Sequence, residues 1–383
     1  MHLSDRDAER LLVEGVQALR AGDAGTARHR FERVTATGRA NGQIWLLLAT
    51  ACRADGDVGA EEAALDALLR IEPRSVRGRI MKGDCRKAAG DEGSALGFYL
   101  SALQIAADMD APADLAAELR RAEAEAAALK ARRLAKREAV LASQGVPPEG
   151  RSARFQNSLD IFSGEKRIFI QEPTDYYFPG LPATQFFDTA DFPWVPELEA
   201  ATGAIRAELE AVLKAGANGF KPYIRSDPNR PRVGHTPLMD SMDWSALFLC
   251  ENGETFAEAV AECPRTWDAV QAAPLPRIAN SPTILFSLLR PGARIAPHTG
   301  THNTRLICHL PLVVPRGCGF RVGNEVRAWE EGKLLIFDDS IEHEAWNESA
   351  EDRVVLIFDI WRPDLSEQER REIGALFYAS SLE

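Results

Sequence analysis

Two histidines and one arginine toward the C-terminal end of the sequence have the residue types and spacing of a metal site. His298 and His343 each lie beside a predicted β-strand, and Arg353 opens the apolar segment RVVLIFDIW. If these strands face each other in a small barrel, the two imidazoles can bind one metal ion. A buried Arg353 can bind a carboxylate through two N–H groups. Together these are the requirements of an iron(II) site that uses 2-oxoglutarate.

The third ligand of such a site is usually the acidic residue of a His-x-Asp or His-x-Glu motif. Here the triplet reads His298-Thr299-Gly300, so that carboxylate is absent. Two neutral imidazoles, Fe(II) and dianionic 2-oxoglutarate give a centre near zero charge, which makes the absence tolerable. We expect each histidine to donate its second ring N–H to a carbonyl or carboxylate. The nearby acidic candidates are Asp338, Asp339 and Glu342.

The elements that would carry these residues are predicted as strands. From Thr283 onward, apolar segments such as TILFSLL and TRLICHLPLVV alternate with Pro-Gly, Arg-Gly and Gly-Asn turns. This pattern favours an antiparallel double-sheet jelly roll, also called a double-stranded β-helix. In the strand that begins at Arg305, alternation places residues 305, 307 and 309 on one face. Trp329 is expected to be a core aromatic of this barrel.

A repeat precedes this region. Gly22-Asp23, Gly56-Asp57 and Gly90-Asp91 are spaced by 34 residues each time, between segments with helical periodicity. A 34-residue period is typical of tetratricopeptide-like repeats, so residues 1–112 are predicted to form an α-solenoid. Residues 113–150 read as a charged capping helix that ends in a Gly- and Pro-containing linker. With residues 151–383 as the strand-rich domain, the fold class is multidomain α + β.

Composition excludes several classes of protein. The net charge of −12 argues against a nucleic-acid binder and against docking on an anionic membrane. No run of eighteen apolar residues occurs, and the first residues, MHLSDRDAER, do not read as a signal peptide. The six cysteines are scattered without a CxxC pair, which indicates buried thiols. We therefore expect no membrane span and a cytoplasmic location.

Several segments of the strand-rich domain closely resemble the aspartyl/asparaginyl β-hydroxylases. The main ones are PHTGTHNTRLICHLPLVVP, WEEGKLLIFDDSIEHEAWN and RVVLIFDIWRPDLS, and DWSALFL and FPGLP extend the resemblance upstream. It covers roughly residues 155–370. Members of that family use two histidines and no carboxylate, which accounts for Gly300. Tetratricopeptide-like repeats ahead of the domain also occur in the family.

The resemblance implies a role for each matching residue. His298 and His343 correspond to the two iron ligands. The residues that would hold the carboxylate groups of 2-oxoglutarate are Arg353, Ser287 and His309. Trp244 would form an aromatic wall of the pocket near the co-substrate.

One position departs from the family pattern. Members that hydroxylate acidic side chains carry arginine at the positions of both Arg305 and Ile307. Loss of one guanidinium would weaken recognition of a substrate carboxylate by a few kcal/mol. The predicted substrate contacts are therefore Arg305 and, as a compensating group, His302. The iron chemistry does not depend on this change.

The resemblance implies an Fe(II)- and 2-oxoglutarate-dependent dioxygenase that consumes O2. Its expected target is the β-carbon of an Asp or Asn side chain in a peptide or protein, delivered by the helical repeats. Three alternatives stay open. They are a hydroxylase of a small molecule or acyl chain, a non-catalytic repeat scaffold, and a cupin that binds another metal. The last usually needs three or four protein ligands, and this chain offers two.

Overall fold

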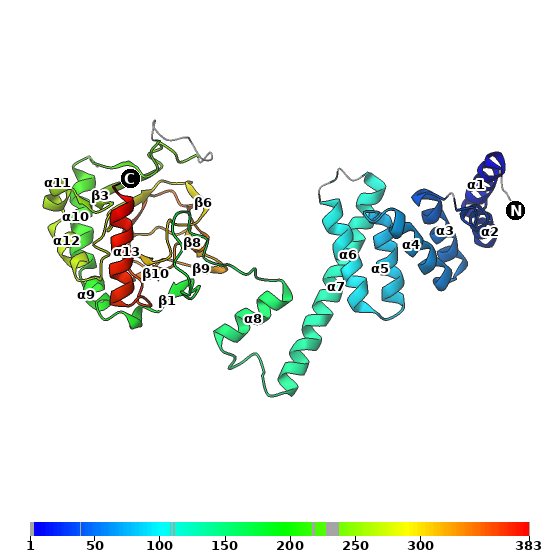
Figure 1. Cartoon of the computed structure of the whole chain (residues 1–383), viewed down its shortest axis with the longest axis horizontal. Helices are drawn as coiled ribbons and strands as arrows, with labels where there is room; N and C mark the ends of the chain where they lie inside the picture. Colours follow the sequence, from blue (N-terminus) through cyan, green and yellow to red (C-terminus); the bar gives the residue numbers. More distant parts are fainter. Residues whose placement is uncertain are drawn as a thin grey trace. The chain divides into compact units, whose positions relative to one another are not determined.

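The computed structural model describes residues 4–38, 40–107, 109, 112–216, 219–226 and 237–382 (Figure 1). The chain divides into two compact units, Met1–Ser158 and Leu159–Glu383. This division falls within helix α8 (Ala153–Ser163), and the domain boundary at residue 150 remains a prediction.

The first unit is an array of paired helices. They are α1 (Asp5–Arg20), α2 (Ala24–Thr35), α3 (Gly42–Asp55), α4 (Val58–Ile71), α5 (Val76–Ala88), α6 (Glu92–Ala106) and α7 (Ala113–Ser143). Each Gly-Asp pair of the repeat makes the turn inside one helix pair. Gly22, Gly56 and Gly90 have φ near +80°, a conformation that glycine adopts without strain. The following aspartates then cap the next helix, and their side chains accept from Thr26, Ala60 and Ser94 N–H.

Small residues at the repeat spacing let the paired helices approach closely. A Cβ at Gly15 would lie 2.6 Å from the Phe31 ring, and one at Gly83 would lie 2.6 Å from the Tyr99 ring. The capping helix α7 packs on this array through Leu115, Ala122, Ala126 and Leu129. The prediction of tetratricopeptide-like helical repeats is confirmed.

The second unit is built on antiparallel strands with helices on its outside. The strands are β1 (Phe186–Phe187), β2 (Lys221–Pro222), β3 (Trp244–Glu251), β4 (Glu254–Thr255), β5 (Ile284–Leu289), β6 (Arg294–His298), β7 (Arg305–Val313), β8 (Cys318–Val322), β9 (Glu325–Arg327), β10 (Leu335–Phe337), β11 (His343–Asn347) and β12 (Arg353–Trp361). The helices after α8 are α9 (Val195–Ala200), α10 (Thr202–Lys214), α11 (Ala257–Glu262), α12 (Pro264–Gln271) and α13 (Glu367–Ser380).

The strands form two sheets. The larger has the order β1-β10-β7-β12-β5-β3-β2, with β4 paired to β3, and the smaller has the order β6-β11-β8-β9. Side chains from both sheets share one apolar cluster, in which Leu289 and Phe337 of the larger sheet meet Phe320 and Val322 of the smaller. The two sheets therefore face each other, which confirms the predicted fold class of helical repeats followed by a double-sheet β domain.

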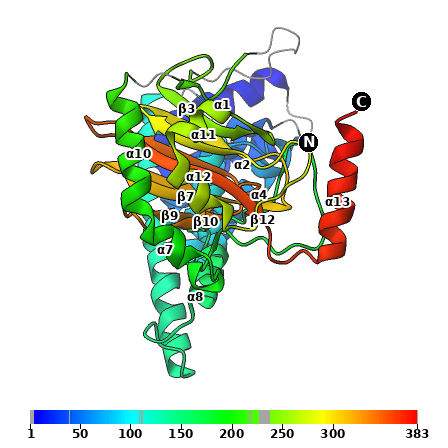
Figure 2. The same cartoon turned by 90° about the vertical axis from the view of Figure 1, so that its left-hand side faces the viewer.

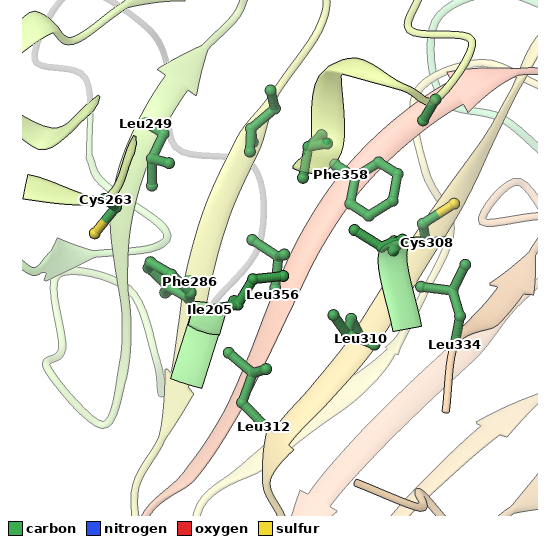
Figure 3. Packing of buried hydrophobic residues seen from close by; sticks show 14 of the residues in the cluster. Ile205, Leu249, Cys263, Phe286, Cys308, Leu310, Leu312, Leu334, Leu356 and Phe358 are labelled. Carbon is green, nitrogen blue, oxygen red and sulfur yellow. The ribbon is translucent and has the colours of Figure 1, made fainter. Parts of the chain in front are cut away.

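The outer face of the larger sheet packs against helices. Figure 2 shows α10, α11 and α12 over this sheet, and Figure 3 shows Ile205 of α10 among sheet residues such as Phe286 and Leu356. Strand β7 contributes Leu306, Cys308, Leu310 and Leu312 to this core. Because side chains alternate along a strand, residues 305, 307 and 309 point to the other face, toward the smaller sheet.

No helix in the described part of the chain combines the length and the apolar composition that crossing a bilayer requires.

Candidate active site

The two predicted metal ligands lie side by side on the smaller sheet. His298 ends β6, His343 begins β11, and the two residues are register partners in this strand pair. Their ring centroids are 4.1 Å apart. The sheet thus brings together two imidazoles that are 45 positions apart in the sequence.

Both rings are oriented by backbone carbonyls. His298 Nδ1 lies 2.9 Å from the Ala296 oxygen, and His343 Nδ1 lies 3.0 Å from the Ile341 oxygen. With the proton on each Nδ1, both Nε2 atoms are acceptors that can bind a metal ion. A carbonyl or carboxylate partner was predicted. Both partners are backbone carbonyls, and the carboxylates of Asp338, Asp339 and Glu342 do not fill this role.

The surroundings favour the neutral form of both rings. Burial, followed by the effect of His298, lowers the pKa of His343 to about 3. Desolvation by the surrounding protein also lowers the pKa of His298, although this residue is exposed to solvent. Neutral imidazoles are the form that binds metals.

An aspartate occupies the space beside Gly300. A Cβ at Gly300 would lie 2.0 Å from Asp339 Oδ2, so position 300 has no room for a side chain. Asp339 is almost fully buried, and its Oδ1 has no hydrogen-bond partner. Burial raises the pKa of this carboxyl to about 7, against the opposing effect of Arg305. The space that a His-x-Asp ligand would need is therefore filled by a carboxyl group from the loop before His343.

Arg353 lies on the inner face of the larger sheet, and no anionic side chain of the described residues forms an ion pair with it. The residue is 1% exposed, and neither Nε nor Nη2 has a hydrogen-bond partner. Its guanidinium lies 4.7 Å from the centroid of the Trp329 ring. Burial lowers the pKa of Arg353 to about 10. A buried cation with two free N–H groups is a site for a bidentate carboxylate.

His309 and Trp329 add further free donors or acceptors to this pocket. His309 Nδ1 and Trp329 Nε1 are buried and have no partner. Burial and then the Arg353 charge lower the pKa of His309 well below its usual value. Since buried polar atoms are normally hydrogen-bonded, this set of free atoms indicates a polar ligand.

Ser287 and Trp244 form the neighbouring wall. Trp244 Nε1 donates to the Ser287 hydroxyl over 3.1 Å, and both residues are buried. The Trp244 ring is 6.4 Å from the His298 ring and stacks on Tyr223 at 4.1 Å. The Ser287 hydroxyl accepts in this bond, so its own proton is available to a ligand.

Arg305 is held by two carboxylates. Its Nη2 lies 3.6 Å from Asp339 Oδ2 and its Nη1 lies 3.5 Å from Asp359 Oδ2. Ile307 packs in the apolar cluster between the sheets. The predicted substrate arginine therefore already has two carboxyl groups beside it, and its Nε lacks a hydrogen-bond partner among the described residues.

His302 lies under the C-terminal helix. Its Nδ1 is 2.8 Å from the Thr304 hydroxyl, and its ring packs on Phe377 of α13 at 5.1 Å. Burial and then the Arg305 charge lower the pKa of His302 to about 3. The structure thus places His302 near Arg305 as a buried, neutral ring.

The sequence analysis assigned no site role to two residues of this pocket, Trp329 and Asp359. Trp329 reads as a core aromatic, which it is, and its free N–H is visible only in three dimensions. Asp359 lies in the strand RVVLIFDIW. Because side chains alternate along a strand, the sequence could have placed Asp359 on the same face as Arg353 and therefore toward the site.

The residues present fit a metal ion with a carboxylate co-substrate. The two Nε2 atoms are free, and the buried Arg353 guanidinium lacks an anion. Among the described residues no cluster of three or more His, Cys, Asp or Glu side chains is arranged to hold a metal, so the two histidines would be the protein's whole contribution.

Comparison with known proteins identifies the second unit. Residues 199–363 match the family model of the aspartyl/asparaginyl beta-hydroxylases. This segment is therefore similar to the aspartyl/asparaginyl β-hydroxylase family. It contains all eight of the predicted site residues. Its resemblance to this family, inferred from the motifs, is confirmed.

Individual relatives agree with this assignment. The human aspartyl/asparaginyl beta-hydroxylase is 37% identical over 183 residues, 48% of this chain and 23% of that protein. The ornithine lipid ester-linked acyl 2-hydroxylase of Rhizobium tropici is 39% identical over 180 residues, 46% of this chain and 60% of that protein. The human aspartate beta-hydroxylase domain-containing protein 2 is 35% identical over 217 residues, 55% of this chain and 56% of that protein.

The chain therefore spans between about a fifth and three fifths of the length of the curated relatives it matches. Among solved structures, PcrH from Pseudomonas aeruginosa matches with a TM-score of 0.31 and 21% identity, over 33% of this chain and 95% of that chain.

Proposed function

We propose that the C-terminal unit is an Fe(II)- and 2-oxoglutarate-dependent dioxygenase that hydroxylates an unactivated C–H bond. The observation that carries this proposal is the pair of adjacent histidines on the smaller sheet, together with the buried Arg353 on the facing sheet, whose Nε and Nη2 have no hydrogen-bond partner among the described residues. The overall reaction takes substrate, 2-oxoglutarate and O2 to hydroxylated substrate, succinate and CO2. When bound, the iron supplies the oxidative chemistry, and the protein supplies binding, orientation and a dry pocket.

The roles of the residues follow from their chemistry. His298 and His343 would hold the metal through Nε2, each oriented by its Nδ1–carbonyl contact. Arg353 would bind one carboxylate of 2-oxoglutarate through Nε and Nη2. Ser287, His309 and the Trp329 N–H would complete the polar surroundings of the co-substrate.

The proposed substrate is the β-carbon of an Asp or Asn side chain in a peptide or protein. The family match and the 37% identity to the human aspartyl/asparaginyl beta-hydroxylase support this choice. In this proposal the helical repeats hold the peptide or protein partner.

Hydroxylation of an acyl chain or small molecule is the second candidate. It is favoured by Arg305, which is shared between two carboxylates, and by Ile307, which adds no second positive charge. The 39% identity to the Rhizobium tropici acyl 2-hydroxylase also supports it.

The first experiment measures succinate by NMR after oxygen is admitted to full-length protein with Fe(II) and 2-oxoglutarate. We expect slow, substrate-independent succinate formation that is lost in His298→Ala and Arg353→Ala. Wild-type protein that neither forms succinate nor binds 2-oxoglutarate with iron would instead support the non-catalytic scaffold.

A second experiment separates the substrate classes. Asp- and Asn-containing peptides and acyl compounds are added in turn, and the increase in succinate above the uncoupled rate is compared. A peptide-dependent increase supports the first candidate, and an increase with acyl compounds alone supports the second.

A further inference from the structure

The segment of residues 171–178, here the clamp segment, joins the two loops that carry the candidate metal ligands. Its backbone N–H groups bond to both. Glu172 N donates to Ser340 O at 2.7 Å, in the loop before His343. Thr174 N donates to Gly300 O at 3.0 Å, in the loop after His298. The clamp segment lies outside residues 199–363, which match the family model.

One side chain in this segment touches both loops at once. Gln171 is buried, and its Nε2 donates to Asp338 Oδ2 at 2.6 Å. Its Oε1 accepts from Asn303 Nδ2 at 3.0 Å. Asn303 follows His298 by five residues, and Asp338 precedes His343 by five. A single amide therefore spans the gap between the two ligand loops.

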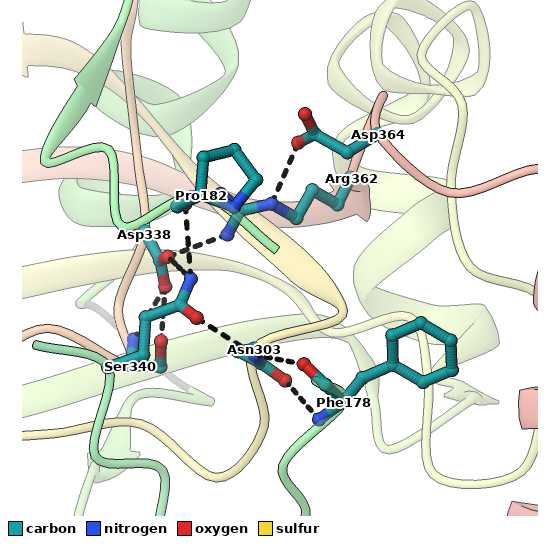
Figure 4. A network of polar contacts seen from close by, with 8 residues as sticks. Phe178, Pro182, Asn303, Asp338, Ser340, Arg362 and Asp364 are labelled. Atoms are coloured by element: carbon teal, nitrogen blue, oxygen red, sulfur yellow. Dashed lines mark hydrogen bonds and ion pairs between the residues drawn. The ribbon is translucent and has the colours of Figure 1, made fainter. Parts of the chain in front are cut away.

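Both ends of this bridge are rigidly held. Asp338 forms an ion pair with Arg362 (Figure 4). Both side chains are fully buried, and Asp338 Oδ2 lies 2.6 Å from Arg362 Nη1. Asp338 Oδ1 accepts from Ser340 N at 3.0 Å, which is an Asx turn. On the other side, Asn303 exchanges two hydrogen bonds with the Phe178 backbone, at 2.8 and 2.9 Å.

The pairing of β6 with β11 is irregular next to a ligand. His298 and His343 are register partners in the β6–β11 pair, but the register shifts between His343 and Ala345. On its other side β11 pairs with β8 without a shift, so the irregularity lies on the side of β11 that faces β6. Such irregularities disrupt a ladder locally and re-aim side chains near active sites. The Gln171 bridge adds contacts from outside the ladder to both loops.

We infer that Gln171 is a positioning residue for the metal centre, acting through Asn303 and Asp338 on the loops that carry His298 and His343. This inference rests on the proposed function, because it presupposes a metal at those histidines. Groups hydrogen-bonded directly to a metal ligand typically contribute 10–100-fold in metal affinity. Gln171 acts through Asn303 and Asp338, so we expect loss of this bridge to weaken binding by the lower end of that range, about 10-fold.

The test titrates full-length protein with Co(II) anaerobically and follows the visible absorption of the bound ion. Gln171→Met keeps the length of the side chain and removes its hydrogen bonds to Asp338 and Asn303, together with a third, longer bond to Pro182 O. Asn303→Asp breaks the bridge from the other side, and keeps the inference testable if the first variant does not fold. Both variants are expected to bind Co(II) about 10-fold more weakly than wild type, at unchanged stoichiometry.

Two control variants separate positioning from general stability. Gln271→Met makes the same substitution at a glutamine that accepts from Arg277, remote from the ligand loops. Glu208→Gln disturbs a polar bridge between α10 and α12, where Glu208 accepts from Arg265 N and Thr266 N. Neither is expected to change Co(II) affinity, even where thermal stability falls.

Each outcome decides between the possibilities. If Gln171→Met binds Co(II) within about twofold of wild type, the bridge has no positioning role and the inference is wrong. The inference is also overturned if Glu208→Gln loses as much affinity at the same thermal stability. If His298→Ala binds as tightly as wild type, the proposed metal site itself fails, and the inference falls with it.

Discussion

The buried charge of Arg353 predicts an unusual effect on stability. Burial lowers the pKa of this guanidinium to about 10, although the group remains charged at neutral pH in the folded and unfolded states. The shift corresponds to a penalty of about 3 kcal/mol for the folded protein without an anion. Arg353→Met removes the charge and keeps an unbranched side chain. It also loses the contact with the Trp329 ring, which contributes about 0.5–2 kcal/mol.

We therefore expect Arg353→Met to stabilise the ligand-free C-terminal unit by about 1–2 kcal/mol. For a unit of this size, that raises the melting temperature by about 2–8 °C. The same variant should no longer be stabilised by 2-oxoglutarate. In wild type, 2-oxoglutarate at about 100 times its Kd should add about 2.7 kcal/mol.

Differential scanning calorimetry of metal-free protein and of protein with Mn(II) and 2-oxoglutarate measures both effects. Arg290→Met is the matched control, because Arg290 forms an ion pair with Asp352 at the surface and its loss should change little. A melting temperature below that of wild type without ligand, combined with full stabilisation by 2-oxoglutarate, would refute this account of Arg353.

Three further predictions concern other parts of the molecule. His298→Ala should weaken Co(II) binding by at least about 100-fold, more than loss of an outer partner does, and equilibrium titration checks this. Gly300→Ala should destabilise the C-terminal unit by about 1–3 kcal/mol, because the new Cβ clashes with Asp339. Adding Asp339→Ala to this variant should restore most of the lost stability. The melting temperatures of the two single variants and the double variant, which should not be additive, measure this coupling. In the helical unit, burial opposes ionisation of Asp84, but hydrogen bonds from Arg121 and Tyr99 lower its pKa overall. This carboxylate therefore stabilises the unit above about pH 4, and its contribution is lost as the pH falls below that. Asp84→Asn should make the free energy of unfolding, measured with urea at a series of pH values, fall less steeply in acid. An unchanged dependence on pH would contradict this.

Features that depend on local chain geometry were predictable from the sequence. The Gly-Asp turns of the repeat need a residue in the left-handed conformation followed by a helix cap. Adjacent residues such as Gly56 and Asp57 meet both requirements. Alternation along β7 likewise placed residues 305, 307 and 309 on one face, because a strand has a period of two. The site roles and the cytoplasmic location remain predictions.

The arrangement of the polar groups around the site was decided by tertiary structure. Asp339 fills the space beside Gly300, and Arg305 is shared between Asp339 and Asp359, although neither pairing has a signature in the local sequence. The contact between Gln171 and Asp338 joins residues 167 positions apart. Such contacts depend on how two sheets and an irregular segment pack together, and no periodicity of a single element encodes that packing. The sequence by itself therefore determined the repeats, the strands and the two histidines, whereas only the fold decided which charges neutralise one another and that Arg353 has no anion beside it.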